Sequence, residues 1–514
     1  MAQWNKQTLA YRSIGGQSHD TSLHEVVMQA DMYGNIITPG ATSTTAFGEP
    51  LAIPLTPIIQ LDSLYGFDPR EFQTFSAAGG SYEYTGTLFK CHTGTSAGGY
   101  GVIRSNRLLR YRSGQGAMTR FTAAFENPQA NVTLRAGFFA QEQALNIGYD
   151  GTQFGVLRQN GGKAHIHEFT ITSGGTGTAN ITLNGVTTNV AIASSDTQVV
   201  ATTIAAASFT GWTVEQVDNK VRFLSNSVGP LAGAFTYGGT GTATLAALQT
   251  GVAHTLNWTY QSDFNIDKLD GTGPSKITLD PSKLNVYQIS FRWLGAGEIR
   301  YAIEDSTTGN MIFFHHEHYS NRNTDVHINN PSFRIGYIAA NLGAGTITDA
   351  HVTGASMMAA QEGIEQDNAF TTATGASRTS LATGSTHHLL GLKNSTVYQN
   401  KINLRKVKLK RLDVSVQSND PVQVYMILNG SQSVAHSYDK VADYSCVIKD
   451  VTTGTYTLAN EHVMAQFVLP AGGAIEVNLD DLELTIPPGN HIDICVDSGQ
   501  TIQSIAAAIT WIEI

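Results

Sequence analysis

This 514-residue sequence has little charge and few cysteines. Only 14% of its residues are charged, and long segments rich in Ala, Glu, Lys and Leu at helical spacing are missing, which argues against a mainly helical protein. Cys91, Cys446 and Cys495 are too few and too widely spaced for a disulfide framework. We therefore expect free thiols that are buried as core residues in a reducing compartment.

A basic surplus is also absent. Lys and Arg number 31 against 41 Asp and Glu, which gives a formal net charge of −10 and disfavours a phosphate backbone as the main partner. Residues 1–6 lack a basic segment followed by an apolar one, and no apolar run approaches bilayer length. The sequence therefore predicts no signal peptide, no membrane insertion and no nucleic-acid partner.

The clearest regular structure lies between residues 284 and 314. Two segments alternate between apolar and polar residues, and a Gly-containing turn at residues 294–297 separates them. Their apolar positions are Tyr287, Ile289, Phe291, Trp293, Ile299, Tyr301 and Ile303. A third apolar segment follows at residues 311–314, so we expect an antiparallel meander whose aromatic face is covered by a second sheet.

Short strand patterns of this kind recur along the chain and predict a mainly β protein. We expect a split, lectin-like antiparallel β-sandwich formed by residues 76–161 and 252–360, with Arg107–Arg112 as one strand. An inserted small α+β module would occupy residues 162–251. A linker at 361–390 would then lead to a C-terminal jelly-roll-like β-sandwich at 391–514.

Residues 1–75 are predicted to form an N-terminal arm and docking segment. Pro50, Pro54 and Pro57 interrupt its apolar residues and exclude a central strand. The apolar side chains around Ile59 and Leu61 therefore need another surface, and we expect a neighbouring subunit to supply it.

The insertion has its own local signals. Asn184–Gly185 is a strong hairpin signal, and Asp196 is placed to cap a helix that runs through Ala207. Strands are expected on both sides, in the order strand, strand, helix, strand, strand. Thr- and Gly-rich seams at 173–178 and 238–242 would mark its ends.

Two groups of side chains are candidate metal sites. They are His315, His316, Glu317 and His318, and the loose loop Asp263, Asp267 and Asp270. The spacing fixes no third or fourth ligand for the histidines, and the loop lacks the alternating oxygen ligands of a calcium loop. We therefore predict no metal and no cofactor.

Catalytic patterns are equally weak. Glu304–Asp305 closes a strand and lacks the spacing of a glycosidase pair, and no glycine-rich loop is followed by Lys and a helix. The sequence therefore predicts no catalytic residues and no enzyme.

Two basic groups and three aromatic residues remain open. The basic groups are Lys401, Arg405, Lys406, Lys408, Lys410 and Arg411, and Arg104, Arg107, Arg110 and Arg112. A solvated strand face is the ordinary interpretation, and an acidic partner surface is the alternative. Trp258, Tyr319 and Tyr337 either pack in a core or line a sugar-binding groove.

Five segments in the first two thirds of the chain are distinctive: Arg107–Gly116, Asp267–Gly273, Leu279–Pro281, Val286–Ile289 and Trp293–Gly295. They resemble segments of structural proteins of tailed bacteriophages. In the insertion, Ile181–Val186, the expected helix and Trp212–Val214 resemble a small module that recurs in phage virion proteins. The C-terminal region resembles attachment or tip domains in its class alone.

This resemblance implies a virion protein, made in the host cytoplasm and present in many copies. It would be a tail fibre, spike, or head or neck appendage that acts in assembly and host attachment. Its partners would be other virion proteins and copies of itself, with a trimer favoured, and host glycan is a further candidate. The alternatives are a carbohydrate- or receptor-binding adhesin module and, third, a glycan-degrading enzyme.

Overall fold

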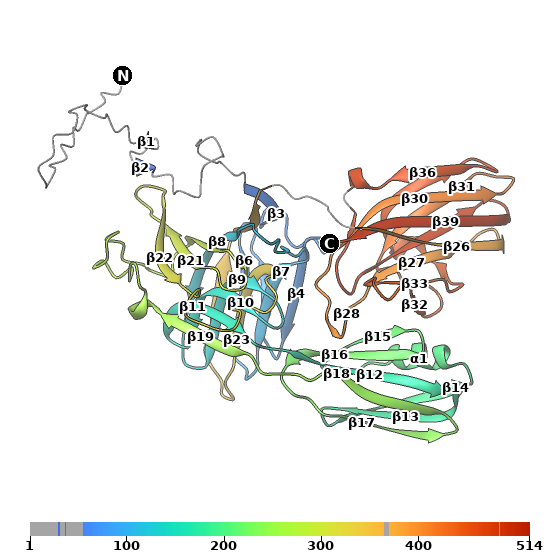
Figure 1. Cartoon of the computed structure of the whole chain (residues 1–514), viewed down its shortest axis with the longest axis horizontal. Coiled ribbons are helices and arrows are strands. Elements are labelled where there is room, and N and C mark those ends of the chain that lie inside the picture. The colour runs from blue at the N-terminus through green and yellow to red at the C-terminus, as the bar shows by residue number, and fades with distance from the viewer. Residues whose placement is uncertain (1–28, 31–35, 38–54, 364–369, 483) are drawn as a thin grey trace, which may run out of the picture. The chain divides into compact units, whose positions relative to one another are not determined.

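The computed structural model describes residues 29–30, 36–37, 55–363, 370–482 and 484–514. The chain divides into a unit from Met1 to Pro54 and a unit from Leu55 to Ile514. In the first unit, the described residues are β1 (Gln29–Ala30) and β2 (Ile36–Ile37), which pair antiparallel. The second unit is mainly β, with several antiparallel sheets (Figure 1). In the described ranges no helix is long and apolar enough to cross a bilayer.

Two sheets form the first sandwich. One has seven strands in the order β19 (Thr255–Tyr260), β11 (Gln153–Asn160), β10 (Ala144–Asp150), β9 (Val132–Phe139), β23 (Arg334–Asn341), β7 (Tyr100–Ser105) and β4 (Phe72–Ala77). The other has nine: β22 (Met311–Glu317), β21 (Ile299–Glu304), β20 (Asn285–Phe291), β8 (Ala117–Glu126), β24 (His351–Gly354), β6 (Phe89–His92), β5 (Ser81–Tyr84), β25 (Ser356–Glu362) and β3 (Leu55–Asp62). The short 3-10 helix η1 (Gln261–Asp263) follows β19.

The predicted meander is β20, β21 and β22, and its alternation places rings in the core. Tyr287, Ile289 and Phe291 are almost fully buried. Across the sandwich, the Phe291 ring meets Phe138 of β9 edge-to-face at 5.5 Å between centroids. The predicted strand at 107–112 is wrong, because its backbone makes one isolated bridge, Leu109 to Phe333.

The docking segment behaves differently from the expectation. Strand β3 pairs with β25 of its own chain, and Ile59 and Leu61 are 2% and 4% exposed. The first sandwich itself therefore covers these side chains, and no neighbour is needed. The proline argument holds in part, since β3 is an edge strand whose register shifts beside Pro57. Pro50 and Pro54 lie outside the described residues.

The insertion folds as two small sheets and one helix. One sheet is β15 (Trp212–Val217), β16 (Lys220–Val228), β12 (Ala164–Ser173) and β18 (Thr242–Gln249), and the other is β14 (Val186–Ser194), β13 (Gly175–Leu183) and β17 (Gly233–Gly239). Helix α1 (Thr197–Ala205) is capped by Asp196, as predicted. Its buried Val200 and Ile204 share a core with Phe169 and Phe223.

The expected strand order of this module was incomplete. Strands β12, β17 and β18 were missed, and the Thr- and Gly-rich seams lie within strands or the turns between them rather than at the module's ends. Thr and Gly carry too little apolar surface to show alternation, although β-branched Thr suits a strand.

The C-terminal sandwich also has two sheets. One contains β26 (Thr371–Leu381), β39 (Ile502–Glu513), β30 (Val407–Gln417), β36 (Ala474–Asn478) and β37 (Thr485–Ile486). The other contains β32 (Tyr438–Lys440), β33 (Val447–Asp450), β27 (Thr386–Asn394), β38 (His491–Ser498), β31 (Val422–Leu428), β35 (His462–Leu469) and β34 (Thr455–Tyr456). A hairpin of β28 (Val397–Tyr398) and β29 (Lys401–Ile402) and two 3-10 helices, η2 (Leu458–Asn460) and η3 (Asp480–Leu482), complete it.

Most of the predicted linker at 361–390 is not a linker. Residues 371–381 form β26, an 11-residue strand that pairs with β39 along its length, and β27 begins at Thr386. None of the β26 side chains is buried, so its sequence lacks the apolar alternation that marks a strand.

Candidate functional site

The histidine cluster at 315–318 gains one partner that the sequence did not indicate. Glu298, just before β21, accepts from His316 Nδ1 at 2.9 Å and lies 3.6 Å from His318 Nδ1. Its other oxygen accepts from Arg300 Nε at 2.6 Å. A carboxylate already paired with a guanidinium competes poorly for a cation, so this group has the geometry of a surface ion-pair network.

His315 points the other way. It is 6% exposed and packs against the rings of Phe264 and Tyr301. Burial lowers the pKa of His315 to about 4, helped by the neighbouring His316 and His318. The side chain is therefore a neutral core residue of the first sandwich.

The aspartate loop is satisfied by its own backbone. Asp267, 3% exposed, accepts hydrogen bonds from the Leu269 and Ser275 amides at 2.8 and 2.7 Å. Burial alone would raise the pKa of Asp267, but these bonds hold it below its ordinary value. Asp270 likewise accepts from the Thr272 amide at 2.9 Å. These are turn aspartates, the ordinary alternative to a calcium loop.

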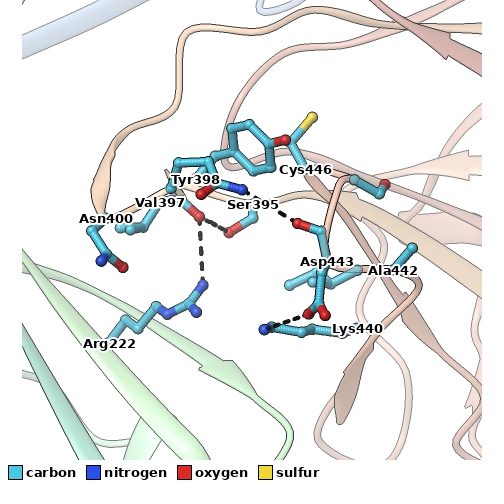
Figure 2. Close-up of a pocket in the computed structure, with 12 residues that line it drawn as sticks. Arg222, Ser395, Val397, Tyr398, Asn400, Lys440, Ala442, Asp443 and Cys446 are labelled. Carbon is cyan, nitrogen blue, oxygen red and sulfur yellow. Dashed lines mark hydrogen bonds and ion pairs between the residues drawn. The ribbon is translucent and has the colours of Figure 1, made fainter. Parts of the chain in front are cut away.

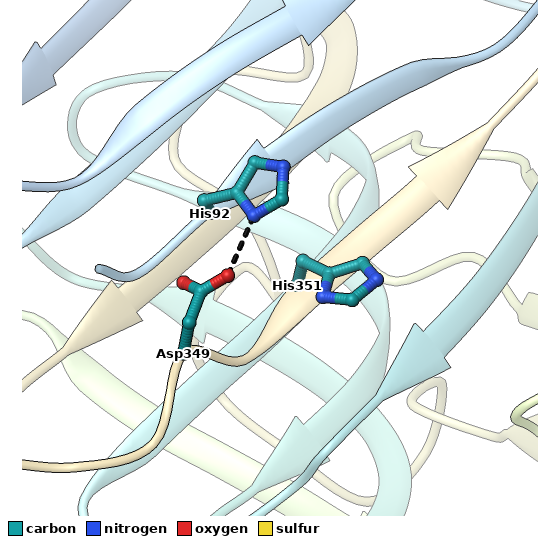
Figure 3. A group of neighbouring side chains, drawn as sticks. All are labelled: His92, Asp349 and His351. Atoms are coloured by element: carbon teal, nitrogen blue, oxygen red, sulfur yellow. Dashed lines mark hydrogen bonds and ion pairs between the residues drawn. The ribbon is translucent and has the colours of Figure 1, made fainter. Parts of the chain in front are cut away.

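A second His–acid group lies on the outer face of the nine-stranded sheet, where β6 pairs with β24 (Figure 3). His92 Nδ1 donates to Asp349 at 2.7 Å, and its Nε2 lies 3.3 Å from Glu83. His351 Nε2 lies 3.2 Å from Glu126. Each histidine therefore lies beside a different carboxylate, and the group forms a row of His–carboxylate pairs across neighbouring strands.

The basic strand face is paired within the chain. Lys410 lies 2.7 Å from Asp480, Arg411 lies 3.1 Å from Asp413, and Arg405 lies 3.4 Å from Glu513. Arg104 is partly buried with its guanidinium 4.8 Å from the centre of the Phe75 ring, and desolvation lowers its pKa to about 10. These contacts favour the ordinary reading of the basic residues over an acidic partner surface.

The three aromatic candidates separate in the structure. Tyr337 is 1% exposed and donates to the Thr122 carbonyl, so the groove interpretation is wrong for it. Tyr319 stacks under Arg158 at 5.4 Å. Trp258 is half-buried on edge strand β19, and its ring lies parallel to that of Tyr260, with 6.4 Å between centroids and 7° between planes.

The inserted module and the C-terminal sandwich share a polar contact around Glu215 of β15. Its carboxylate is fully buried, lies 3.2 Å from Lys393 Nζ and accepts from the Thr396 amide at 3.1 Å. Beside it, Gln216 accepts from the Tyr438 amide at 2.6 Å and donates to the Tyr438 carbonyl at 3.0 Å. In these bonds, side chains of β15 pair with backbone groups of the C-terminal sandwich.

A small pocket of about 120 Å³ lies next to this contact. Figure 2 shows Arg222 of β16 reaching the Val397 carbonyl and Lys440 paired with Asp443. Since these polar groups are already partnered, the pocket is better described as the edge of the contact than as a ligand site.

Comparison with known proteins yields little. No family model and no curated protein matches the sequence. Among solved structures, the chain is similar to the cellulose-induced protein Cip1 (9% identity, 59% of this chain, 96% of that chain, TM-score 0.24). It is also similar to a lectin from Bauhinia forficata in complex with GalNAc (8%, 59% and 97%, 0.23). A chain of the Sputnik virophage structure matches with 10% identity, 93% and 90% coverage and a TM-score of 0.12. At these TM-scores, the matches carry no argument about this chain.

Proposed function

We propose that the chain is a structural subunit of a bacteriophage virion, of the tail-fibre, spike or head–neck appendage type, with roles in assembly and host attachment. One observation carries the proposal. The insertion that resembles a recurring phage virion module folds around a core of its own. Ile181 and Trp212, which belong to the segments that carry the resemblance, lie in that core. A domain with a separate core can be exchanged between proteins as a unit.

Copies of the chain are the proposed first partner, with a trimer favoured. Strand β26 pairs with β39 and, among the described strands, with no other. It is 11 residues long and, apart from Arg378, carries no charge to block a further strand. Long, uncharged edges are usually covered, and a symmetric neighbour is one way to cover them.

The test is location. Antibodies raised against the purified full-length chain should label virions of the phage whose genome encodes it. Mass spectrometry of these virions should find several copies of the chain per particle. A chain that stays in the soluble fraction while intact particles lack it would refute the proposal. Sedimentation of the purified protein separately tests the oligomeric state. A chain that is a monomer at micromolar concentration, and that is also present as single copies at each position in the particle, would refute the trimer.

The unit from Met1 to Pro54 is the proposed attachment segment. Because β3 begins at Leu55, a chain lacking Met1–Pro54 keeps every described strand of the second unit. This variant should show the circular dichroism of the full chain and be missing from particles. Full incorporation would assign docking to another region.

A carbohydrate- or receptor-binding role is the second candidate, and the Trp258–Tyr260 pair favours it. Sugar faces stack on such half-buried rings. On a glycan array, Trp258→Ala should abolish any signal of the full chain. Phe75→Ala is the matched control, because Phe75 is 42% exposed on β4 at the opposite edge of the same sheet. Equal loss in both variants, or no signal in the full chain, counts against this role. A reducing-sugar assay on the same samples tests the third candidate, a glycan-degrading enzyme, which we do not expect.

A further inference from the structure

The outer face of the β27–β38 sheet in the C-terminal sandwich holds a third, deeper cluster of histidines and acids. Ile492 and Ile494 point into the sandwich core, so His491 and Asp493 lie on the opposite face of β38. Residues 429–437, the covering segment between β31 and β32, reach that face, since the Gly430 carbonyl oxygen lies 3.1 Å from His491 Nε2. The cluster consists of His388, His436, Asp450, His491 and Asp493.

Three of these side chains converge on one point. One nitrogen each of His436 and His491 and one oxygen of Asp493 all lie within 4.8 Å of one another. His491 Nε2 is 3.2 Å from Asp493 Oδ2. The two imidazole Nε2 atoms also lie 3.2 and 3.1 Å from the same backbone oxygen, that of Gly430.

Asp493 is the unusual member. Its side chain is fully buried, and within the described part of the chain neither of its oxygens has a hydrogen bond of normal geometry. The facing nitrogens, His491 Nε2 and His388 Nε2, stand 3.2 and 3.5 Å away. Charge-assisted N–H···O bonds are shorter, about 2.7–2.9 Å. A buried carboxylate held at this distance from its partners needs something else to satisfy it.

A metal ion would account for these separations. Nitrogen and oxygen ligands lie about 2.0–2.2 Å from zinc in a tetrahedral arrangement, which places two ligand atoms roughly 3.4 Å apart. The observed 3.2 Å between His491 and Asp493 is close to that edge length.

The surrounding contacts have the form of a support for metal-binding imidazoles. His436 Nδ1 donates to Asp450 at 2.7 Å, and His388 Nδ1 donates to the Thr452 carbonyl at 2.8 Å. Asp450 is itself held by the Thr452 amide at 2.7 Å. A carboxylate or carbonyl on the far nitrogen orients a ligating imidazole and raises its basicity.

The backbone also leaves room for Asp493. A Cβ placed on Gly391 of β27 would lie 2.6 Å from Asp493 Oδ1 and 3.2 Å from His388 Nε2. Any other residue at position 391 would therefore displace the carboxylate or the imidazole. Glycine at this point of β27 keeps both polar groups where they meet.

We propose that His436, His491 and Asp493 bind one divalent transition-metal ion, with zinc the best match to two imidazoles and a carboxylate. His388 positions Asp493 from the opposite side. The ion fixes the covering segment, which carries His436, to strand β38, which carries His491 and Asp493. This site departs from the sequence-based expectation of no metal, because its ligands come from a loop and a strand that only the fold brings together.

The two histidines of the site reach the surface. The side chains of His436 and His491 are 18% and 16% exposed, whereas Asp493 is closed off. The other two His–acid groups differ in this respect, since their carboxylates are half-exposed or already paired with Arg300. Neither has a fully buried acid without a hydrogen bond.

The test is metal content of the full-length chain purified from zinc-supplemented cells. We expect about one zinc per chain by elemental analysis, and a fall in melting temperature when EDTA removes it that zinc reverses. Cobalt added to the stripped protein should give the visible absorption of a tetrahedral site. The EDTA and cobalt experiments use the unaltered protein and do not depend on a variant folding.

Variants then assign the ligands. His436→Gln and His491→Gln should lower bound zinc at least tenfold, whereas His316→Gln, in the paired group at Glu298, should leave it unchanged. Less than about 0.2 zinc per chain, together with no response to EDTA or cobalt, would overturn the proposal in favour of a protonated histidine–carboxylate network. Zinc lost in His316→Gln and kept in the other two would overturn it as well.

Discussion

The two large sandwiches fill their cores with different side chains. The first packs rings, and its fully buried members include Phe89, Phe121, Phe125, Phe138, Phe314, Phe333, Tyr287, Tyr301 and Tyr337. Among the buried described residues of the C-terminal core, Trp511 is the single aromatic residue, and the rest are mostly Leu, Val and Ile. An aromatic side chain fills a large volume and has few rotatable bonds. Branched aliphatic side chains are smaller, so more of them are needed to fill the same core volume.

Their outer faces differ as well. The ion pairs around His92 and His351 lie on a half-exposed face, where water shares their solvation. In the C-terminal sandwich, residues 429–437 reach the corresponding face through Gly430 and His436, and Asp450 and Asp493 are fully buried. A polar residue on the outer face of a sheet is thus unremarkable until another segment covers it, and then it needs a partner.

Removing β3 should show how far the first sandwich depends on its edge. A chain lacking Met1–Phe67 loses the burial of Ile59 and Leu61, each worth about 1.5–3 kcal/mol. We expect a clear drop in the unfolding temperature of the first sandwich and none in that of the C-terminal sandwich. Hydrogen exchange measures the unfolding of each sandwich separately. The chain lacking Met1–Pro54 is the control and should match the full chain. Equal stability of the two truncations would contradict the role given to β3.

Single core truncations sharpen the comparison between rings and aliphatics. Phe138→Ala removes a ring that touches Phe291 and Phe333, and should cost about 3–5 kcal/mol. Ile494→Val, at a 1% exposed position of the C-terminal core, should cost about 0.5–1.5 kcal/mol. Denaturant unfolding with exchange read out for each sandwich measures both. A larger loss for Ile494→Val would mean that the cores are not packed as described.

The sequence predicts the fold best where one face of a strand is apolar. Tyr287, Ile289 and Phe291 show that alternation, and β20 lies where it was expected. Strand β26 was missed because none of its side chains is buried, and β12 because its side chains are buried on both faces. In both cases, alternation between apolar and polar residues disappears for opposite physical reasons.

The candidate sites were harder to predict than the fold. The dense run at 315–318 is a clear histidine pattern in the sequence. In the structure, however, His315 belongs to the core, and the partner Glu298 lies just before the neighbouring strand β21. His491 and Asp493 did carry a local clue, since residues two apart on a strand share a face. The third ligand, His436, comes from a loop whose position no spacing rule could supply.

A buried histidine makes the first sandwich sensitive to acid. His327 is fully buried next to Arg158, and burial, with a smaller effect of that charge, lowers its pKa from 6.5 to about 4. Between these values the unfolded chain binds a proton that the folded chain does not. Through His327, stability should therefore fall as the pH drops from 6.5 to 4, by at most about 1.4 kcal/mol per pH unit, and the similarly buried His315 adds a dependence of its own.

His327→Phe should flatten that pH dependence in thermal unfolding of the first sandwich, whatever its effect at neutral pH. His318→Gln, at a half-exposed position, is the control and should keep the slope of the unaltered chain. An unchanged slope in His327→Phe would assign the acid sensitivity to other groups.

The smallest expected effect is confined to the inserted module. Asp196 accepts from the Gln198 and Val199 amides at 2.8 and 3.2 Å, which satisfies two of the free N–H groups at the start of α1. Asp196→Ala should cost about 1 kcal/mol, and Asp196→Ser should recover most of it, because a hydroxyl can accept the same bonds. The apolar face of α1 packs in the module's core, while Gln198 and Thr202 also bond to Ser437 of the C-terminal sandwich, so faster amide exchange should appear mainly in α1 and β14 while β20 and β38 stay unchanged. If exchange rises equally in both sandwiches, the module is not an independent cooperative unit. The separate core would then no longer support the virion proposal.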